Sequence, residues 1–267
     1  MLCGFTPLAD RMLGLGPKDG QPLMSICLFC KENVEQGAPV EHIWPESFGG
    51  SRLATAPEGS VCTSCNNYFS YEVERAALES FPFKFVRTLF GIPTKKRKLS
   101  YQENALGKFV GQPGGRFLYL DPSSKEDLSR MKPGDTFQLK LKTDPEDPIA
   151  VCRLLLKMGI ELLAKMNLPE AFLAAYDSAR EFARAPKRGS EWSFALTMDS
   201  DAFLKSFQKG INAIEDFGAS MQILDHFGNA FILMEILGFK LLSPLVQNIA
   251  AEPLINESDL RVYKVVV

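Results

Sequence analysis

The sequence lacks a long apolar run. Its longest one, NAFILMEILGF at residues 229–239, is interrupted by Glu235 and is shorter than the roughly 20 apolar residues of a membrane-spanning helix. This stretch therefore predicts a strand or a core segment, and we expect no transmembrane helix. The N-terminal stretch MLCGFTPLADRMLGLG has no basic leader and places Asp10 and Arg11 among its apolar residues, so we expect no secretion signal either. The expected location is the cytoplasm.

The chain also lacks an excess of charge of either sign. Its 30 Lys and Arg residues face 32 Asp and Glu residues, which leaves a net charge of −2. Composition therefore gives no general argument for a polyanionic partner, and a nucleic-acid contact would need a local or metal-supplied positive field. Internal repeats and low-complexity tracts are missing as well, while 46% hydrophobic residues over 267 positions predict a soluble globular protein of one large or two modest domains.

Cysteine is present but is not spaced like a disulfide framework. Four of the six cysteines form two CxxC pairs of equal spacing, CLFC and CTSC. In a reducing compartment such pairs indicate metal binding, because four thiolates complete a tetrahedral structural zinc site. The predicted zinc ligands are Cys27, Cys30, Cys62 and Cys65. Zinc would then hold the residues between the pairs in a small domain.

Histidine is scarce, with two in the chain, and one of them lies between the cysteine pairs in the stretch VEHIWPESFGG, residues 40–50. A zinc ion with four thiolates leaves His42 unused. A neutral imidazole can take a proton from water, and Glu41 is a hard oxygen ligand suited to Mg²⁺. The pair is therefore a candidate for metal-assisted hydrolysis of a phosphate ester, with a packing or hydrogen-bonding histidine as the alternative.

A helix is predicted directly after the second cysteine pair. The stretch CNNYFSYEVERAALES, residues 65–80, is followed by the first helix-breaking residue, Pro82. Asn66 and Asn67 fall in the first turn, where an amide oxygen can complete a hard-cation site and the helix N-terminus attracts a phosphate. The alternative is that one or both asparagines cap the helix.

Taken together and in this order, CLFC, EHIWPESFGG and CTSCNN resemble the zinc-stapled branch of the HNH endonucleases. That family has a ββα-metal fold that holds one catalytic divalent ion, and the resemblance covers about residues 25 to 80. It implies that His42 is the general base, that Glu41 and Asn66 bind Mg²⁺ or Mn²⁺, and that the four cysteines bind zinc. Asn67 is the alternative to Asn66 as the second ligand of the catalytic ion.

One position departs from the family pattern. The family often carries a middle asparagine nine residues before its final metal ligand, and this chain has Pro57 there. That asparagine usually orients the loop or the histidine. The resemblance therefore requires Ser60 or a backbone carbonyl to take over this role, and the geometry of the base stays open at this point.

We divide the chain into an N-terminal arm over residues 1–24, an HNH nuclease domain with its zinc site over 25–92, and a mixed α+β domain over 93–267. The predicted fold class is therefore α+β. A basic run at the joint between the last two parts is interpreted as a solvated loop or as a phosphate contact. It consists of Lys95, Lys96, Arg97 and Lys98.

Beyond this joint, the periodicity of the apolar residues predicts mixed secondary structure. Strands are expected at residues 115–120, 135–143, 191–198 and 260–267, and a hairpin at 219–239. Helices are expected at 147–166, 170–183 and 199–214. These segments carry no recognisable catalytic grouping, so we expect this region to select the target or to sense a signal.

These observations predict a metal-dependent endonuclease that hydrolyses DNA. The expected partner is double-stranded DNA, no membrane partner is expected, and a homodimer is one candidate assembly. The resemblance suggests bacterial defence or mobile-element biology as the setting. The alternative is a non-catalytic, zinc-stapled module that binds nucleic acid or protein, an interpretation that the near-neutral charge and the missing middle asparagine favour.

Overall fold

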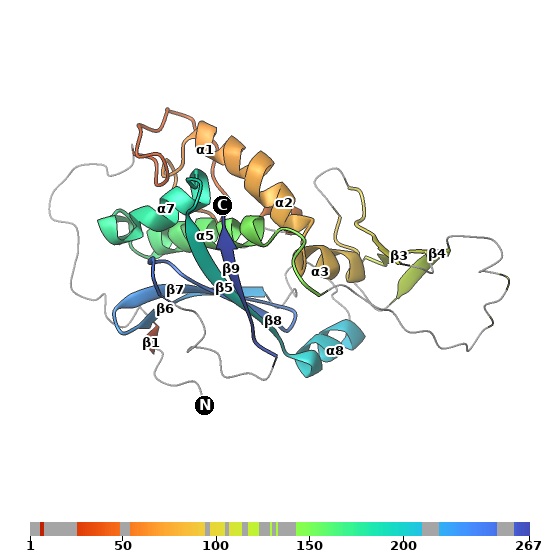
Figure 1. Ribbon diagram of the computed structural model, residues 1–267. Helices are drawn as coiled ribbons and strands as arrows, with labels where there is room; N and C mark the ends of the chain where they lie inside the picture. Colours follow the sequence, from red (N-terminus) through yellow and green to blue (C-terminus); the bar gives the residue numbers. More distant parts are fainter. Residues whose placement is uncertain are drawn as a thin grey trace.

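The structure is a computed structural model. It describes residues 6–7, 26–48, 54–93, 97–104, 107–113, 117–122, 129, 132, 143–209, 219–249 and 259–267. Several predictions lie outside the described residues, namely most of the N-terminal arm, Lys95 and Lys96 of the basic run, and all but the last residue of the strand expected at 135–143. In Figure 1 a layer of helices covers one face of the main sheet.

The N-terminal unit begins with short backbone pairings and ends in helices. Isolated bridges join Ile26 to Asn33 and His42 to Thr55. The helix predicted at 65–80 is present as a continuous helical run from Thr63 to Leu78. The elements of this unit are a 3₁₀ turn (Glu46–Phe48), α1 (Thr63–Tyr68), a π-helical segment (Phe69–Glu74), α2 (Arg75–Leu78) and α3 (Phe83–Leu89).

The first of these helices starts at a cysteine and not at an asparagine. Cys62 is the N-cap of α1, and its sulfur accepts a hydrogen bond from the backbone N–H of Cys65 at 3.4 Å. Asn66 and Asn67 therefore lie inside the helix and do not cap it. Because the capping atom is a sulfur of the CxxC pair, the start of the helix is tied to the cysteine cluster.

A small antiparallel sheet projects from the helical layer at the right of Figure 1. Its strands, in spatial order, are β2 (Gln102–Asn104), β3 (Gly107–Gly111) and β4 (Leu118–Pro122). Strand β4 overlaps the strand predicted at 115–120. A Cβ atom on Gly111 would lie 2.2 Å from the carbonyl oxygen of Leu89, so β3 passes the end of α3 where only glycine fits.

Helix α5 (Pro148–Met166) runs between the other helices and the main sheet (Figure 1). Its start follows the expected pattern of a cap and a proline. The carboxylate of Asp147 accepts a hydrogen bond from the N–H of Ala150 at 2.8 Å, and Pro148 occupies the first turn. The helix predicted at 147–166 is thus confirmed.

The two sides of α5 face different parts of the molecule. A Cβ atom on Gly159 would lie 2.6 Å from a side-chain carbon of Leu245 and 3.1 Å from Ile232, so this side meets the main sheet at close range. A helix turns by about 100° per residue, which places Lys157 on the opposite side. That side faces the N-terminal unit.

The helix predicted at 170–183 is interrupted. The structure has α6 (Leu168–Ala171), a 3₁₀ turn (Ala174–Tyr176) and α7 (Asp177–Arg184). Leu173 has a φ of −58° and a ψ of 144°, which no helix accommodates. The buried guanidinium of Arg180 donates hydrogen bonds to the carbonyl oxygens of Ala171 and Leu173, so it satisfies groups that the break leaves open. The prediction of one continuous helix is therefore wrong.

Among the described residues, six strands form the antiparallel main sheet in the order β1-β6-β7-β8-β5-β9. They are β1 (Thr6–Pro7), β5 (Glu191–Met198), β6 (Ala219–His226), β7 (Asn229–Ile236), β8 (Phe239–Pro244) and β9 (Arg261–Val266). The strands predicted at 191–198 and 260–267 are confirmed as β5 and β9. Helix α8 (Ser200–Lys209) matches the described part of the helix predicted at 199–214.

The hairpin predicted at 219–239 is present, but the strand β8 that follows it was not predicted. Phe227 and Gly228 form the first turn, with φ values of 52° and 81°. The second turn uses Leu237 and Gly238, with φ values of 49° and 86°. Leucine is rare at positive φ, so Gly238 alone gives a residue-preference signal for this turn.

The apolar core is continuous from the N-terminal unit to the main sheet. Phe69, Leu155 and Phe239 belong to the same buried cluster, and the rings of Phe81 and Phe239 meet edge to face at 5.4 Å. The predicted α+β class is confirmed, with the cysteine-rich unit first and the sheet-rich region after it. The boundaries after residues 24 and 92 stay a prediction. No described helix combines enough length with enough hydropathy to cross a bilayer.

Candidate functional site

The four cysteines of the two CxxC pairs meet at one point. Their sulfur atoms all lie within 4.8 Å of one another, and those of Cys30 and Cys62 are 3.7 Å apart. Cys27, Cys62 and Cys65 are buried, whereas Cys30 is half-buried. Four sulfur donors at this separation fit a tetrahedral structural zinc site, which has no open position for a substrate.

Hydrogen bonds favour the thiolate form of one cysteine in this cluster, and a thiolate is the form that binds a metal ion. The hydrogen bond from the Cys65 thiol, helped by backbone N–H groups, lowers the pKa of Cys27 to about 4. Burial raises the pKa of Cys30 to about 11. A bound zinc ion would overcome this difference, because coordination deprotonates a thiol outright.

A cationic donor to the cluster comes from far along the chain. Nε of Arg184, in the last turn of α7, donates to Sγ of Cys65 at 3.3 Å, and its guanidinium lies 4.0 Å from the ring centroid of Tyr68. Arg153 of α5 donates to the hydroxyl oxygen of Tyr68 at 2.7 Å. A charged donor of this kind orients a metal-bound thiolate. No sequence motif indicates Arg184, because 119 residues separate it from Cys65.

Glu41 and His42 lie on a short antiparallel pairing. The N–H of Ile43 donates to the carbonyl oxygen of Ala54 at 3.0 Å, and the N–H of Ala56 donates to the carbonyl oxygen of Glu41 at 2.9 Å. These bonds flank His42 and hold its backbone. The side chain of Glu41 is buried and His42 is half-buried.

The carboxylate of Glu41 is paired with a buried lysine of α5. Nζ of Lys157 lies 2.5 Å from Oε1 of Glu41, 3.1 Å from Oε1 of Glu74 and 3.1 Å from Oε2 of Glu161. The same nitrogen donates to the backbone oxygen of His42 at 3.1 Å. One ammonium therefore contacts three carboxylates and the backbone of the candidate base. We call these four side chains, Glu41, Glu74, Lys157 and Glu161, the lysine cluster.

Burial and attraction set the charges in the lysine cluster. Burial by itself would lower the pKa of Lys157, but the carboxylates of Glu161, Glu74 and Glu41 raise it above its ordinary value, so the ammonium stays protonated. Burial raises the pKa of Glu41, against the opposing effect of Lys157. Burial also raises the pKa of Glu161 well above its ordinary value, which favours the neutral acid there.

A signal for the lysine cluster was present in the sequence. Lys157 and Glu161 are four residues apart within the apolar helix at 147–166, and neither side chain has exposed surface. Charged residues are almost never fully buried unless they are paired. The apolar periodicity predicts a core helix here and does not indicate which groups its charged residues contact.

The two asparagines after the second cysteine pair differ in exposure. Asn66 is half-buried and Asn67 is exposed. Both precede the π-helical segment Phe69–Glu74, which widens the helix and ends at Glu74 of the lysine cluster. The same helical run thus carries a cysteine ligand at its start, the asparagines in its first turns and Glu74 further along.

Ser60 orients its own loop, which is one of the two roles expected of the missing middle asparagine. Its hydroxyl donates to the carbonyl oxygen of Pro57 at 2.6 Å, and its own carbonyl accepts a hydrogen bond from Leu28 at 2.8 Å. The hydroxyl of Ser60 therefore closes its own turn, and its carbonyl links this turn to Leu28, which lies between Cys27 and Cys30. The hydrogen bond to the backbone of His42 comes from Lys157 instead.

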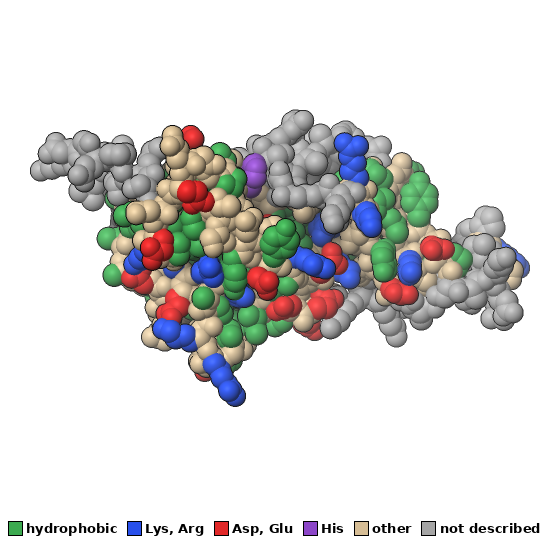
Figure 2. All heavy atoms as spheres, turned by 90° about the horizontal axis from the view of Figure 1, so that it is seen from above, with side chains coloured by type: hydrophobic (Ala, Val, Ile, Leu, Met, Phe, Trp, Pro, Cys, Tyr) green, Lys and Arg blue, Asp and Glu red, His purple; other side chains and the backbone are tan. Residues whose placement is uncertain are grey.

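The described half of the basic run is exposed. Arg97 and Lys98 lie in a loop closed by a bridge between Pro93 and Leu99. In Figure 2, which views the helical layer from above, basic and acidic side chains are interspersed. A phosphate-binding role for Arg97 and Lys98 stays a prediction.

Comparison with known proteins identifies the N-terminal part of the chain. Residues 27–82 match the family model described as HNH endonuclease. This range holds the four-cysteine cluster together with Glu41, His42 and Asn66. The unit is therefore an HNH domain with a cysteine cluster suited to structural zinc, and the family indicates a nuclease-type function on nucleic acid. No curated protein and no solved structure matches the chain.

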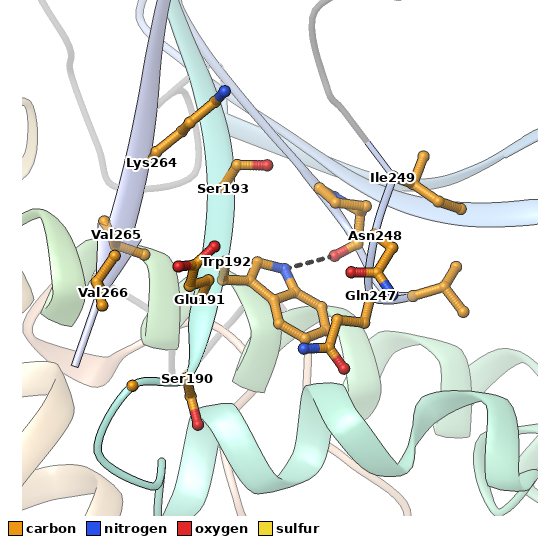
Figure 3. Close-up of a pocket in the computed structure, with 13 residues that line it drawn as sticks. Ser190, Glu191, Trp192, Ser193, Gln247, Asn248, Ile249, Lys264, Val265 and Val266 are labelled. Carbon is orange, nitrogen blue, oxygen red and sulfur yellow. Dashed lines mark hydrogen bonds between the residues drawn. The ribbon is translucent and has the colours of Figure 1, made fainter.

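The sheet-rich region contains a cavity of its own. It has a volume of about 480 Å³ and lies beside β5 and the edge strand β9 (Figure 3). Its lining includes Trp192, Gln247, Asn248 and Lys264. The indole N–H of Trp192 donates to the carbonyl oxygen of Pro244 at 3.1 Å, which holds the ring in place. None of the candidate residues of the HNH domain belongs to this lining.

Replacement of Cys62 by serine is expected to abolish stoichiometric zinc binding. A structural zinc ion contributes on the order of 10 kcal/mol to the folding of small domains, so thermal stability should fall sharply as well. Elemental analysis and thermal unfolding measure the two effects. Cys152→Ala is the matched control, because Cys152 is also buried but lies outside the cluster, and it should keep its zinc. Full zinc retention by Cys62→Ser would contradict the four-thiolate site.

Arg184→Ala is expected to weaken zinc binding by roughly 10-fold to 100-fold, because it removes the charged donor from the thiolate of Cys65. The rate of zinc transfer to a chelator measures this loss. Arg188→Ala is the control, since Arg188 is an exposed residue shortly after α7. Equal resistance of both variants to the chelator would show that the Arg184 contact does not hold the ligand.

Proposed function

We propose that the protein is an endonuclease that hydrolyses phosphodiester bonds of DNA with one divalent ion, Mg²⁺ or Mn²⁺. The observation that carries this proposal is the placement of Glu41 and His42 side by side on a fixed backbone pairing within the part that matches the HNH endonucleases. The zinc site has a structural role, because its four sulfur donors leave no position open for a substrate.

The donor set fits a hard divalent cation. The carboxylate of Glu41 and the amide oxygen of Asn66 are oxygen ligands of the kind that Mg²⁺ and Mn²⁺ prefer. Oε1 of Glu41 is held by Lys157, so the second carboxylate oxygen is the one that can bind an ion. Asn67 is the alternative ligand, and its exposure makes it the weaker candidate.

His42 acts as the general base in this proposal. Imidazole changes its protonation near neutral pH, so a ring nitrogen can accept the proton of the attacking water. The backbone bonds on both sides of His42 and the bond from Lys157 to its carbonyl hold the backbone from which the ring extends. The divalent ion, when bound, would stabilise the negative charge that develops on the phosphate and on the leaving oxygen.

His42→Ala is expected to lower the rate of plasmid cleavage by at least about 100-fold, which is the usual contribution of a general base. Conversion of supercoiled to nicked and linear DNA measures it. His226→Ala is a matched control, because His226 is the other histidine of the chain and ends β6 in the sheet-rich region. Cleavage by His42→Ala at the wild-type rate, with zinc content unchanged, would refute the assignment of the base.

A second candidate function is a non-catalytic module that binds nucleic acid or protein. The contact between the ammonium of Lys157 and Glu41 favours it, because a cation already neutralises the carboxylate that would bind the ion. The net charge of −2 also provides no general attraction for a polyanion. The two functions differ in whether Glu41 takes part in binding a divalent ion.

Glu41→Gln is expected to weaken Mn²⁺ binding by about 10-fold or more, since a neutral amide replaces a charged ligand. Isothermal titration of Mn²⁺ into the zinc-loaded protein measures this loss. Glu58→Gln serves as the control, because Glu58 is an exposed carboxylate of the same domain. Identical Mn²⁺ isotherms for wild type and Glu41→Gln would favour the non-catalytic module.

The setting of this activity is also a proposal. We infer double-stranded DNA as the substrate, the cytoplasm as the location, a homodimer as the candidate assembly, and bacterial defence or mobile-element biology as the context. Residues 93–267 would select the target or sense a signal, and the cavity beside Trp192 gives such a signal a place to bind. Digestion of plasmid, linear and single-stranded DNA tests the proposed substrate, and light scattering tests the proposed homodimer.

A further inference from the structure

Lys157 contacts the two proposed catalytic residues from a different part of the chain. Its ammonium lies 2.5 Å from the carboxylate of Glu41 and 3.1 Å from the backbone oxygen of His42. The sequence separation between Lys157 and His42 is 115 residues. The contact therefore exists only in the folded chain.

The position of this ammonium is fixed. Lys157 has no exposed surface, and its neighbours on α5 are buried. Gly159 brings the other side of the helix against Leu245 and Ile232 of the sheet-rich region, so α5 cannot shift without breaking the core. An ammonium has three N–H donors and no acceptor, so its contacts hold Glu41 and the His42 backbone at set distances.

A contact with DNA does not account for Lys157, because a side chain without exposed surface cannot reach a phosphate. Stability does not account for it either. Buried ion pairs cost so much desolvation that apolar residues of similar volume often replace them without loss. The direction of the ammonium, toward Glu41 and His42, is thus the informative feature.

We propose that Lys157 is a positioning residue of the nuclease site. Its ammonium holds one carboxylate oxygen of Glu41 and the carbonyl of His42, so that the second oxygen of Glu41 faces the ion and the imidazole faces the water. Lys157 thereby provides, from α5, the support that Pro57 and Ser60 do not give. This inference rests on the proposed nuclease function.

The HNH domain is consequently incomplete without the sheet-rich region. Residues 27–82 contain the ligands and the base, but the group that orients them belongs to α5. Loss of the ammonium would leave the carboxylates of Glu41 and Glu74 and the buried carboxyl group of Glu161 close to one another without a cation between them. Without the contact from Lys157, no group would hold Oε1 of Glu41, so this side chain would no longer present its second oxygen in a fixed position.

Lys157→Met in the full-length, zinc-loaded protein tests this proposal. The variant keeps most of the side-chain volume and removes the charge. We expect Mn²⁺ affinity in isothermal titration to fall by about 10-fold and kcat for plasmid cleavage to fall by about 100-fold, as for other residues that orient metal ligands. The KM for DNA should stay within about 2-fold, because the buried side chain does not touch the substrate.

Glu161→Gln is the matched control. Glu161 is as buried as Lys157 and contacts its ammonium. Because burial raises the pKa of Glu161 and favours the neutral acid, the neutral amide of glutamine is a close substitute. It should leave Mn²⁺ affinity and kcat within about 3-fold of wild type, whatever its effect on thermal stability. Parallel losses of affinity and kcat in Glu161→Gln and Lys157→Met would mean a general packing role and would overturn the proposal.

Two further outcomes would also overturn it. Wild-type affinity and kcat in Lys157→Met would show that the contact has no positioning effect. Tighter Mn²⁺ binding with faster cleavage would show that the ammonium competes with the ion for Glu41. A failure of the nuclease proposal itself is recognised separately, because wild type and His42→Ala would then cleave DNA equally.

A second variant covers the case in which Lys157→Met does not fold. Lys157→Met combined with Glu161→Leu removes the ammonium and its most buried carboxylate together, which leaves an apolar pair of similar volume. We expect this variant to fold and to show the same loss of Mn²⁺ affinity and kcat. Wild-type values in the double variant would overturn the proposal.

Discussion

The burial of α5 on both sides is the constraint on which the rest of the molecule depends. One side carries Gly159 and meets the main sheet so closely that even a Cβ atom there would require Leu245 to shift. The other side carries Lys157, and an ammonium without exposed surface needs anionic partners because its desolvation costs several kcal/mol. Glu41 of the HNH domain is one of those partners, so the packing of the helix also sets the position of a proposed catalytic residue.

The two anionic centres of the HNH domain are each met by a cation from the sheet-rich region. The guanidinium of Arg184 donates to the cysteine cluster at Cys65, and the ammonium of Lys157 contacts the carboxylate of Glu41. Both cations lie on helices that belong to the shared apolar core. The proposed metal ligands are thus close together in sequence, whereas the cations that contact them are remote.

The parts of the fold that sequence patterns predicted are those with local causes. The CxxC spacing predicted the cysteine cluster, and the helical spacing of apolar residues predicted α5. Periodicity failed where a single residue departs from its usual preference. Leu173 interrupts a segment with helical spacing, and Leu237 adopts a positive φ in the turn before β8. In both places the tertiary packing overrides the local preference of the residue.

The sequence by itself determined the chemistry that is available to this protein, since the four cysteines, Glu41, His42 and the asparagines lie within one short stretch whose order matches the HNH endonucleases. Only the tertiary structure decided what surrounds that chemistry. In the folded chain, the hydroxyl of Ser60 donates a hydrogen bond within its own turn. Lys157 contacts the carboxylate of Glu41 and the backbone of His42, although 115 residues separate Lys157 from His42. The reason is physical: ligand spacing is a local property of the chain, but a buried charge finds its counter-charge only when the core closes around both.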